Sequence, residues 1–323
     1  MKRRTFIAGL GSAVAWPMVA RAQQAVLPVI GFVQLGSADA AAGWVAAFRQ
    51  GPSETGYVEG QNVTIEYHWL EGQFDRLPAL MADLVRRRVA LIATPNSTAA
   101  AIAAKAATTT IPIVFGVAEA VRFGLVTSLA RPDGNATGVN GFATELVAKR
   151  LGILHELVPK AVRVAVLFNS ANVGAFLPDV EKAARAIGLQ IHVLNATTSG
   201  EIDAAFATLT RERPDALFVS PDSFFGSRPV QITTLAARDR IPASYPNRYF
   251  VEDGGLMSYG DSQTERFRQV GVYTGKILNG AKPADLPVVQ STKFEFIINA
   301  QTARTLGLTI PETLLATADE VIQ

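Results

Sequence analysis

Short apolar runs alternate along the chain with stretches whose apolar residues recur at helical spacing. Val29–Val33 is a mainly apolar run typical of a buried strand, and Ala41–Thr55 follows as a predicted helix that ends at Gly56. The alternation continues to Ile113–Phe115 and restarts at Val164–Phe168. Because strands that alternate with helices form right-handed βαβ units, the pattern predicts an α/β protein with parallel sheets.

Two segments share the same order of features. Leu91–Ser97 (LIATPNS) and Leu217–Ser223 (LFVSPDS) each combine an apolar strand with a polar turn that contains proline. Each is followed by an Ala-containing helical stretch and then by an Ile-Pro pair, at Ile111-Pro112 and Ile241-Pro242. We interpret this weak repeat as two Rossmann-like lobes; the alternative is a chance similarity between two βαβ units.

The C-terminal part leaves this regular alternation. Gly255–Gly260 is a predicted strand, Phe267–Leu278 a predicted helix, and Phe294–Asn299 a further strand. Such a tail can supply one element to each lobe, which would connect the lobes several times and leave a hinge and a cleft between them. We therefore expect residues 25–138 with 258–285 to form lobe 1, and residues 139–257 with 286–323 to form lobe 2.

The first 22 residues have the composition of an export signal. Basic residues at positions 2–4 precede an apolar stretch over 6–20, which is too short to span a bilayer as a stable helix. Ala20 and Ala22 fit the two positions that a signal peptidase reads. Arg3-Arg4 favours twin-arginine export over general secretion, and a buried N-terminal helix is the remaining alternative. We expect a periplasmic protein from which residues 1–22 have been removed.

Composition and charge limit the possible functions. The chain of 323 residues is 49% hydrophobic and contains no cysteine, which excludes disulfides, Cys nucleophiles and thiolate metal sites. Removal of residues 1–22 leaves 26 basic against 28 acidic residues, and this near-neutral chain has no electrostatic footprint for nucleic acid. No cofactor is expected, because export argues against ATP- or NAD-dependent chemistry. No metal is expected either, because the three histidines and the acidic residues form no ligand cluster.

Small polar residues follow the predicted strands, where ligands bind in open α/β sheets. Ser97 or Thr98 would lie at a helix N-terminus, whose free N–H groups and dipole favour a carboxylate. Glu119 or Asp222 could pair with an ammonium group, and the tyrosines could cover a ring or an alkyl chain. The alternatives are helix caps and turns for the polar residues, and core packing for the tyrosines. The candidate ligand-binding residues are Ser37, Asn96, Ser97, Thr98, Glu119, Asn169, Asp222, Tyr245 and Tyr259.

Several characteristic stretches are spread over most of the chain. They include Glu54–Asn62 (ETGYVEGQN), Asp75–Leu80 (DRLPAL), Gly134–Val139 (GNATGV) and Gly255–Gly260 (GLMSYG). In this combination the chain resembles the ABC-transporter substrate-binding family that includes tryptophan- and tyrosine-type binding proteins. The resemblance implies a type 1 periplasmic binding protein, in which two Rossmann-like lobes joined by a hinge close on a small solute.

The family's site carries over in part. The turns at Gly36-Ser37 and Asn96–Thr98 match, whereas many relatives have a Gly-Asp-Pro-like sequence where this chain reads Gly116–Ala120 (GVAEA). This departure leaves the solute open, with an amino acid or a related aromatic or aliphatic acid expected. The resemblance implies a non-enzymatic protein, expected to be monomeric, that hands its solute to the membrane permease of an ABC transporter. An exported enzyme such as a hydrolase and a ligand-sensing module are the alternatives on the same fold.

Overall fold

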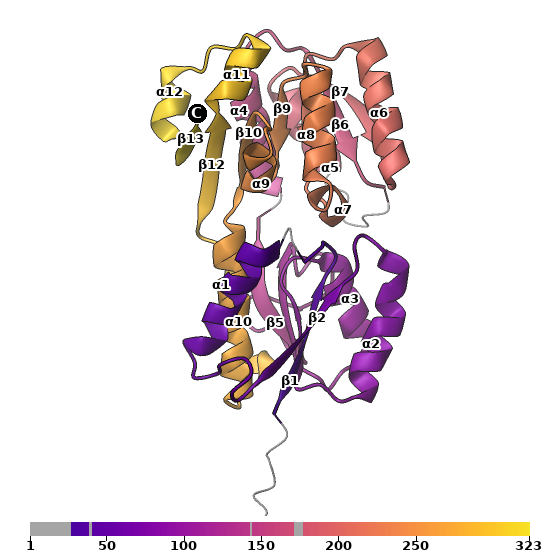
Figure 1. Cartoon of the computed structure of the whole chain (residues 1–323), viewed down its shortest axis with the longest axis vertical. Helices are drawn as coiled ribbons and strands as arrows, with labels where there is room; N and C mark the ends of the chain where they lie inside the picture. Colours follow the sequence, from indigo (N-terminus) through magenta and orange to yellow (C-terminus); the bar gives the residue numbers. More distant parts are fainter. Residues whose placement is uncertain (1–26, 39–40, 143, 171–176) are drawn as a thin grey trace, which may run out of the picture.

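The computed structural model describes residues 27–38, 41–142, 144–170 and 177–323, which form the two lobes seen one above the other in Figure 1. Each lobe contains one sheet with helices on both faces. The two-lobe α/β architecture predicted from the alternating pattern is therefore confirmed. The expected export signal at residues 1–22 lies outside the described residues.

The first sheet has the strand order β11-β5-β4-β3-β1-β2, and all its neighbouring strands are parallel. Its strands are β1 (Val29–Gln34), β2 (Thr64–Trp69), β3 (Leu91–Thr94), β4 (Ile113–Ala118), β5 (Ala136–Gly141) and β11 (Val289–Gln290). One face is covered by α1 (Ala42–Ser53) and α10 (Gln263–Leu278), and the other by α2 (Leu77–Arg86) and α3 (Thr98–Ala107). Successive residues of β1 serve both cores, because Phe32 packs on the α1 and α10 side and Val33 on the α2 and α3 side.

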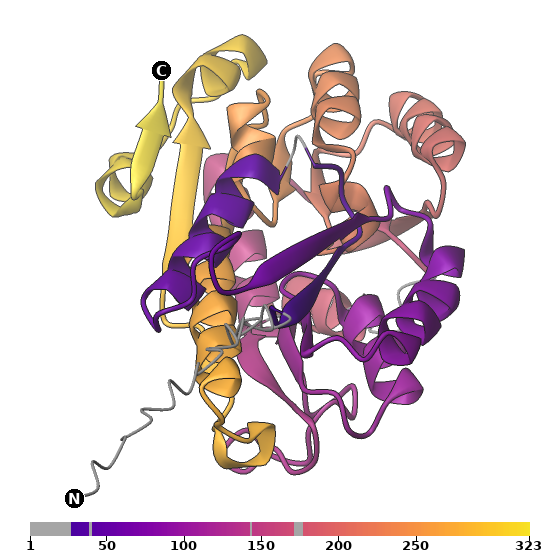
Figure 2. The ribbon, with the colours of Figure 1, turned by 60° about the horizontal axis from the view of Figure 1, so that its bottom comes forward.

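Helices α1 and α10 approach each other closely through glycine, and Figures 1 and 2 show them side by side. A Cβ atom at Gly51 would lie 2.4 Å from the backbone nitrogen of Val272, and one at Gly271 would lie 2.2 Å from the carbonyl oxygen of Phe48. Only glycine leaves room for two backbones at this distance. Helix α10 therefore belongs to the first lobe, although it follows most of the second lobe in the chain.

The second sheet has the strand order β13-β12-β10-β9-β8-β6-β7. Its strands are β6 (Arg163–Phe168), β7 (Gln190–Asn195), β8 (Ala216–Val219), β9 (Ala243–Tyr245), β10 (Met257–Asp261), β12 (Phe294–Asn299) and β13 (Glu320–Ile322). The sheet is predominantly parallel, as expected, and its one antiparallel pair among the described strands is β10 with β12. The reversal arises because β10 runs toward the first lobe, whereas β12 begins where the chain returns from it.

Helices again cover both faces of the second sheet. One face carries α4 (Thr144–Leu157), α5 (Leu177–Ala186), α11 (Ala300–Leu306) and α12 (Glu312–Thr317). The other face carries α6 (Ser199–Glu212), α7 (Ser223–Gly226), α8 (Pro229–Arg238) and α9 (Arg248–Glu252). Two short 3-10 turns, Phe74–Arg76 and Pro283–Asp285, complete the helices.

The chain passes between the sheets three times, after β5, after β10 and after β11. These passages correct the expected lobe boundaries. Residues 139–141 and 289–290 pair in the first sheet rather than in lobe 2, and residues 258–261 pair in the second sheet rather than in lobe 1. Each strand belongs to the sheet with which it forms backbone hydrogen bonds. The pattern of apolar residues alone does not show these pairings. The tail does supply an element to each lobe, α10 to the first and β12 to the second.

Candidate functional site

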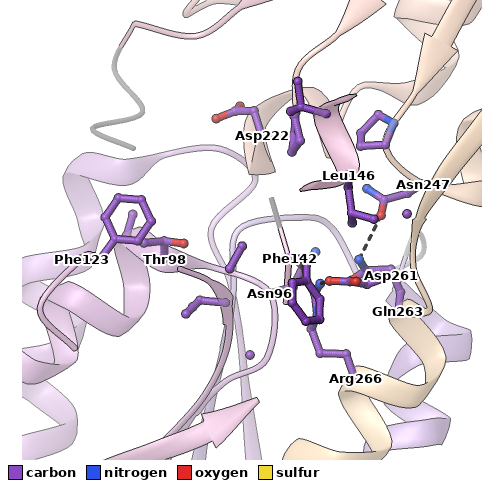
Figure 3. Close-up of a pocket in the computed structure, with 18 of the residues that line it drawn as sticks. Asn96, Thr98, Phe123, Phe142, Leu146, Asp222, Asn247, Asp261, Gln263 and Arg266 are labelled. Carbon is purple, nitrogen blue, oxygen red and sulfur yellow. Dashed lines mark hydrogen bonds and ion pairs between the residues drawn. The ribbon is translucent and has the colours of Figure 1, made fainter. Parts of the chain in front are cut away.

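A cavity of about 190 Å3 lies between the lobes, where the strands of both sheets end. Asn96 and Thr98, after β3, line it from the first lobe, and Asp222 and Asn247, after β8 and β9, line it from the second. Figure 3 shows these side chains on opposite sides of the space. The aromatic residues of the lining come from both lobes and the connections between them: Phe74, Phe123, Phe142, Tyr249 and Tyr259.

Four of the nine sequence-predicted residues line this cavity, namely Asn96, Thr98, Asp222 and Tyr259. The structure does not bring the other five to its lining: Ser37, Ser97, Glu119, Asn169 and Tyr245. Contact of any of the nine with a solute stays a prediction, and the cavity favours the first four.

The turn after β3 places Ser97 and Thr98 in different roles. Ser97 is buried, and its Oγ accepts a hydrogen bond of 3.0 Å from the backbone N–H of Ala100. It is therefore the N-cap of α3, which was the alternative considered for this residue. Thr98 is the first residue of α3, and it lines the cavity beside the positive end of the helix dipole.

Asn169 and Asp222 form one hydrogen-bonded unit in the second lobe. The Nδ2 atom of Asn169 donates to Oδ1 of Asp222 over 3.1 Å, and the backbone N–H groups of Phe224 and Phe225 donate to the same oxygen. Asn169 thus orients the carboxylate of Asp222 at the edge of the cavity. Of the two acids considered for an ammonium group, only Asp222 is placed in the lining, since Glu119 lies outside it.

The two predicted tyrosines also separate. Tyr245 is only 1% exposed, and its ring stacks on Phe250 at a centroid distance of 4.9 Å within the second-lobe core. Burial raises the pKa of its hydroxyl group. Tyr259 is partly exposed, lines the cavity and stacks on Phe294. Core packing, the alternative reading, therefore describes Tyr245 fully, whereas Tyr259 packs against a core and also lines the cavity.

A buried ion pair at the base of the cavity was missed by the sequence analysis. The Nη2 atom of Arg266 lies 2.5 Å from Oδ2 of Asp261, and Nη1 donates to Oδ1 of Asn96 over 3.2 Å. Burial raises the pKa of the Asp261 carboxyl group, and the adjacent guanidinium of Arg266 opposes this shift. Beside the pair, Nε2 of Gln263 donates to Oδ1 of Asn247 over 2.9 Å, the dashed contact near these two residues in Figure 3.

Arg150 of α4 is a second buried arginine in the lining that the sequence analysis missed. Its guanidinium lies 4.1 Å from the ring centre of Phe218, and Nη2 donates to the carbonyl oxygens of Val219 and Ser244. Burial lowers the pKa of Arg150 to about 9, so the side chain keeps its positive charge at neutral pH. The available signal was positional, because Arg150 interrupts an apolar helical stripe that includes Leu146, Val147 and Leu154.

The cavity thus combines aromatic surface with fixed charges and amides from both lobes. No group of three or more His, Asp or Glu side chains among the residues of known placement could hold a metal ion. No helix within that part of the chain is long and apolar enough to cross a membrane. Such a lining can hold a small solute that has both an apolar ring and polar groups.

Comparison with known proteins agrees with this geometry. The model of the family "ABC transporter substrate binding protein" matches residues 27–322. A "Tyrosine-binding protein" of Clostridioides difficile (strain R20291) is 26% identical over 258 residues, which are 79% of this chain and 74% of that protein.

Two solved structures give further detail. The ABC domain from Streptococcus pneumoniae in complex with L-Trp is 25% identical, with a TM-score of 0.83 over 92% of this chain and 100% of that chain. The ligand-free, open structure of a substrate-binding protein with adhesive properties from Clostridium difficile has the same identity and coverage but a TM-score of 0.64. The lobes of this protein are therefore arranged more like those of the L-Trp complex.

More distant periplasmic binding proteins of the LacI type share the architecture, so the expected type 1 fold is confirmed. Proteins of the matched family bind small solutes and deliver them to a membrane permease. The match covers nearly all of the described chain and agrees with a solute-sized cavity between two lobes. The chain therefore belongs to the family of ABC transporter substrate-binding proteins.

Proposed function

We propose that this protein captures an aromatic amino acid, or a closely related aromatic acid, in the cavity between its lobes. The observation that carries the proposal is the lining, in which aromatic rings from both lobes surround a space that also holds Asp222 and two arginines. A ring would pack on Phe123, Phe142 and Tyr259, and an ammonium group would pair with Asp222. The tyrosine and tryptophan relatives support the same solute class.

Capture proceeds by closure of the lobes. A solute that touches Thr98 in the first lobe and Asp222 in the second makes both contacts only when the lobes are close together. It therefore shifts the population toward the closed arrangement by the free energy of the contacts that the open arrangement lacks. The three chain passages between the lobes act as the hinge.

We further propose that the protein works as a monomer in the periplasm, after loss of residues 1–22, and releases its solute unchanged to an ABC permease. The family match supports this view. Recovery of an altered solute after incubation with the protein would instead indicate an enzyme. N-terminal sequencing of the exported protein tests the predicted cleavage after Ala22.

A thermal-shift screen with L-tryptophan, L-tyrosine, L-phenylalanine, L-leucine and indole-3-propionate tests the solute class. Binding at about 100 times Kd stabilises the folded protein by about 2.7 kcal/mol. The variant Asp222→Asn keeps the hydrogen bonds to α7 but removes the charge, so it should weaken the binding of amino acids and spare indole-3-propionate, which has no ammonium group. Asp203→Asn, on an exposed face of α6, is the matched control. No shift with any of these solutes would contradict the proposal.

A further inference from the structure

Arg150 is a buried cation that the described part of the protein leaves without a counter-ion. Its side chain is 1% exposed, and none of the ion pairs among the residues of known placement includes it. Two of its nitrogen atoms, Nε and Nη1, have no hydrogen-bond partner within the described ranges of the chain, whereas Nη2 donates to Val219 and Ser244. Burial of an uncompensated charge opposes folding strongly unless a partner balances it.

The other buried arginine of the cavity shows the contrast. Arg266 has the carboxylate of Asp261 at 2.5 Å and the amide oxygen of Asn96 at 3.2 Å. The charge of Arg266 is therefore balanced within the protein. Among the described residues, the contacts recorded for the guanidinium of Arg150 are the ring of Phe218 and two neutral carbonyl groups.

The unbalanced cation lies at the cavity. Leu146 and Val147 stand four and three residues before Arg150 on α4, which places all three on one side of the helix, and all three line the cavity. Figure 3 shows Leu146 on the second-lobe side of the cavity, together with Asp222 and Asn247. An anionic group on this side of a bound solute can balance the charge of Arg150.

We propose that Arg150 binds the carboxylate of the captured solute. This assignment rests on the proposed function and narrows it, because it makes a carboxylate a required part of the solute. It also places the anionic group on the second-lobe wall, whereas the hydroxyl of Ser97 at the start of α3 is already engaged with Ala100. Nη1, which has no partner among the described residues, supplies donors that a carboxylate can accept beside the positive charge of the guanidinium.

Calorimetric titration of L-tryptophan and L-tryptophanamide against wild-type protein and variants tests the assignment. The two probes differ only in the carboxylate. Wild-type protein should bind L-tryptophan about 10–100-fold more tightly than the amide, the range expected for hydrogen bonds to a charged group. Arg150→Gln, which removes the charge but keeps a polar side chain, should reduce this ratio to near one. Lys149→Gln, at the exposed neighbouring position, should preserve the wild-type ratio.

The outcomes separate the two proposals. If Arg150→Gln weakens both probes equally, or leaves the affinity for L-tryptophan unchanged, the role of Arg150 is structural and the assignment is overturned, while the proposed function stands. A different outcome is that wild-type protein binds no aromatic amino acid but another carboxylate, such as L-leucine. If Arg150→Gln then no longer binds that carboxylate, the assignment stands and the aromatic class is wrong. A solute without any anionic group overturns the assignment. Arg150→Lys, which keeps the charge but only one donor position, replaces Arg150→Gln if that variant does not fold, and a ratio between one and the wild-type value is then expected.

Discussion

The Nη2 atom of Arg266, in a helix of the first lobe, lies 2.5 Å from Oδ2 of Asp261, the last residue of a strand in the second sheet. One of the three passages between the lobes lies between these two residues. Their side chains are only 9% and 2% exposed, so solvent screens the pair little. The pair therefore ties the hinge together directly under the solute cavity.

Loss of the carboxylate at this position should destabilise the fold. We expect Asp261→Asn to lower the free energy of unfolding by about 3–5 kcal/mol, because it leaves the guanidinium of Arg266 buried and unbalanced. The added change Arg266→Met should restore part of this loss, since it removes the unbalanced charge. Urea unfolding of the two variants and wild-type protein measures both effects.

The matched control is Glu181→Gln, which disrupts an exposed pair with Arg185 in α5. We expect it to change the free energy of unfolding by no more than about 0.5 kcal/mol. If Asp261→Asn has an equally small effect, the buried pair does not stabilise the hinge.

Gly141, at the end of β5, packs directly against this pair. A Cβ atom there would lie 2.2 Å from Oδ2 of Asp261 and 2.8 Å from Nη2 of Arg266. We expect Gly141→Ala to displace the pair and lower both the unfolding temperature and the affinity for the solute. Gly152→Ala is the control, because its Cβ meets no atom within 4 Å and alanine favours the helix by up to about 1 kcal/mol. Equal unfolding temperatures for the two variants would contradict this prediction.

Arg122, after β4, and Asp179, in α5, form an ion pair of 3.4 Å between the lobes. Because this contact requires the lobes to be close together, Asp179→Asn should favour the open arrangement and weaken solute binding by up to about 5-fold. The wild-type affinity should also fall more steeply with salt than that of the variant. Titrations at low and high salt measure both changes, with Glu181→Gln as a control on the same helix. Identical salt dependence in wild-type protein and Asp179→Asn would show that the ion pair does not favour the closed arrangement.

His68, in β2, makes stability depend on pH. Burial lowers the pKa of its imidazole, and the nearby carboxylate of Glu66 opposes this shift. A depressed histidine contributes stability above its unfolded pKa of about 6.5 and loses it as the pH falls through the folded value. The free energy of unfolding should therefore fall less for His68→Gln than for wild-type protein between about pH 7 and about pH 5. His192→Gln, at an exposed position in β7, should retain the wild-type difference.

The two-lobe architecture could be predicted because its signals are local. Apolar strand runs and helical spacing each depend on residues close together in the chain, and Asp222 and Tyr259 were found because they lie at or near the ends of such strands. The lobe boundaries could not be predicted in this way, because β5 and β11 are far apart in the chain and pair only in the folded protein. The antiparallel pairing of β10 with β12 is likewise a long-range contact.

The rest of the site depends on contacts that the sequence pattern does not record. Tyr245 lies in a strand as Tyr259 does, but its ring is directed into the second-lobe core. Ser97 stands beside Thr98, yet its hydroxyl is used by the helix that it caps. Arg150 and Arg266 reach the cavity from helices, whereas the candidate residues were sought in the turns after strands.

The close crossing of α1 and α10 also sets an order for the assembly of the molecule during synthesis. The nascent chain produces α1 early, but the glycines that receive it at Gly271 and Gly275 emerge only after most of the other half has been made. Until then the apolar face around Phe48 has no cover, so the half that is translated first stays incomplete while much of the other half is synthesised. A polypeptide that ends before Gln263 consequently exposes this apolar surface to chaperones and proteases.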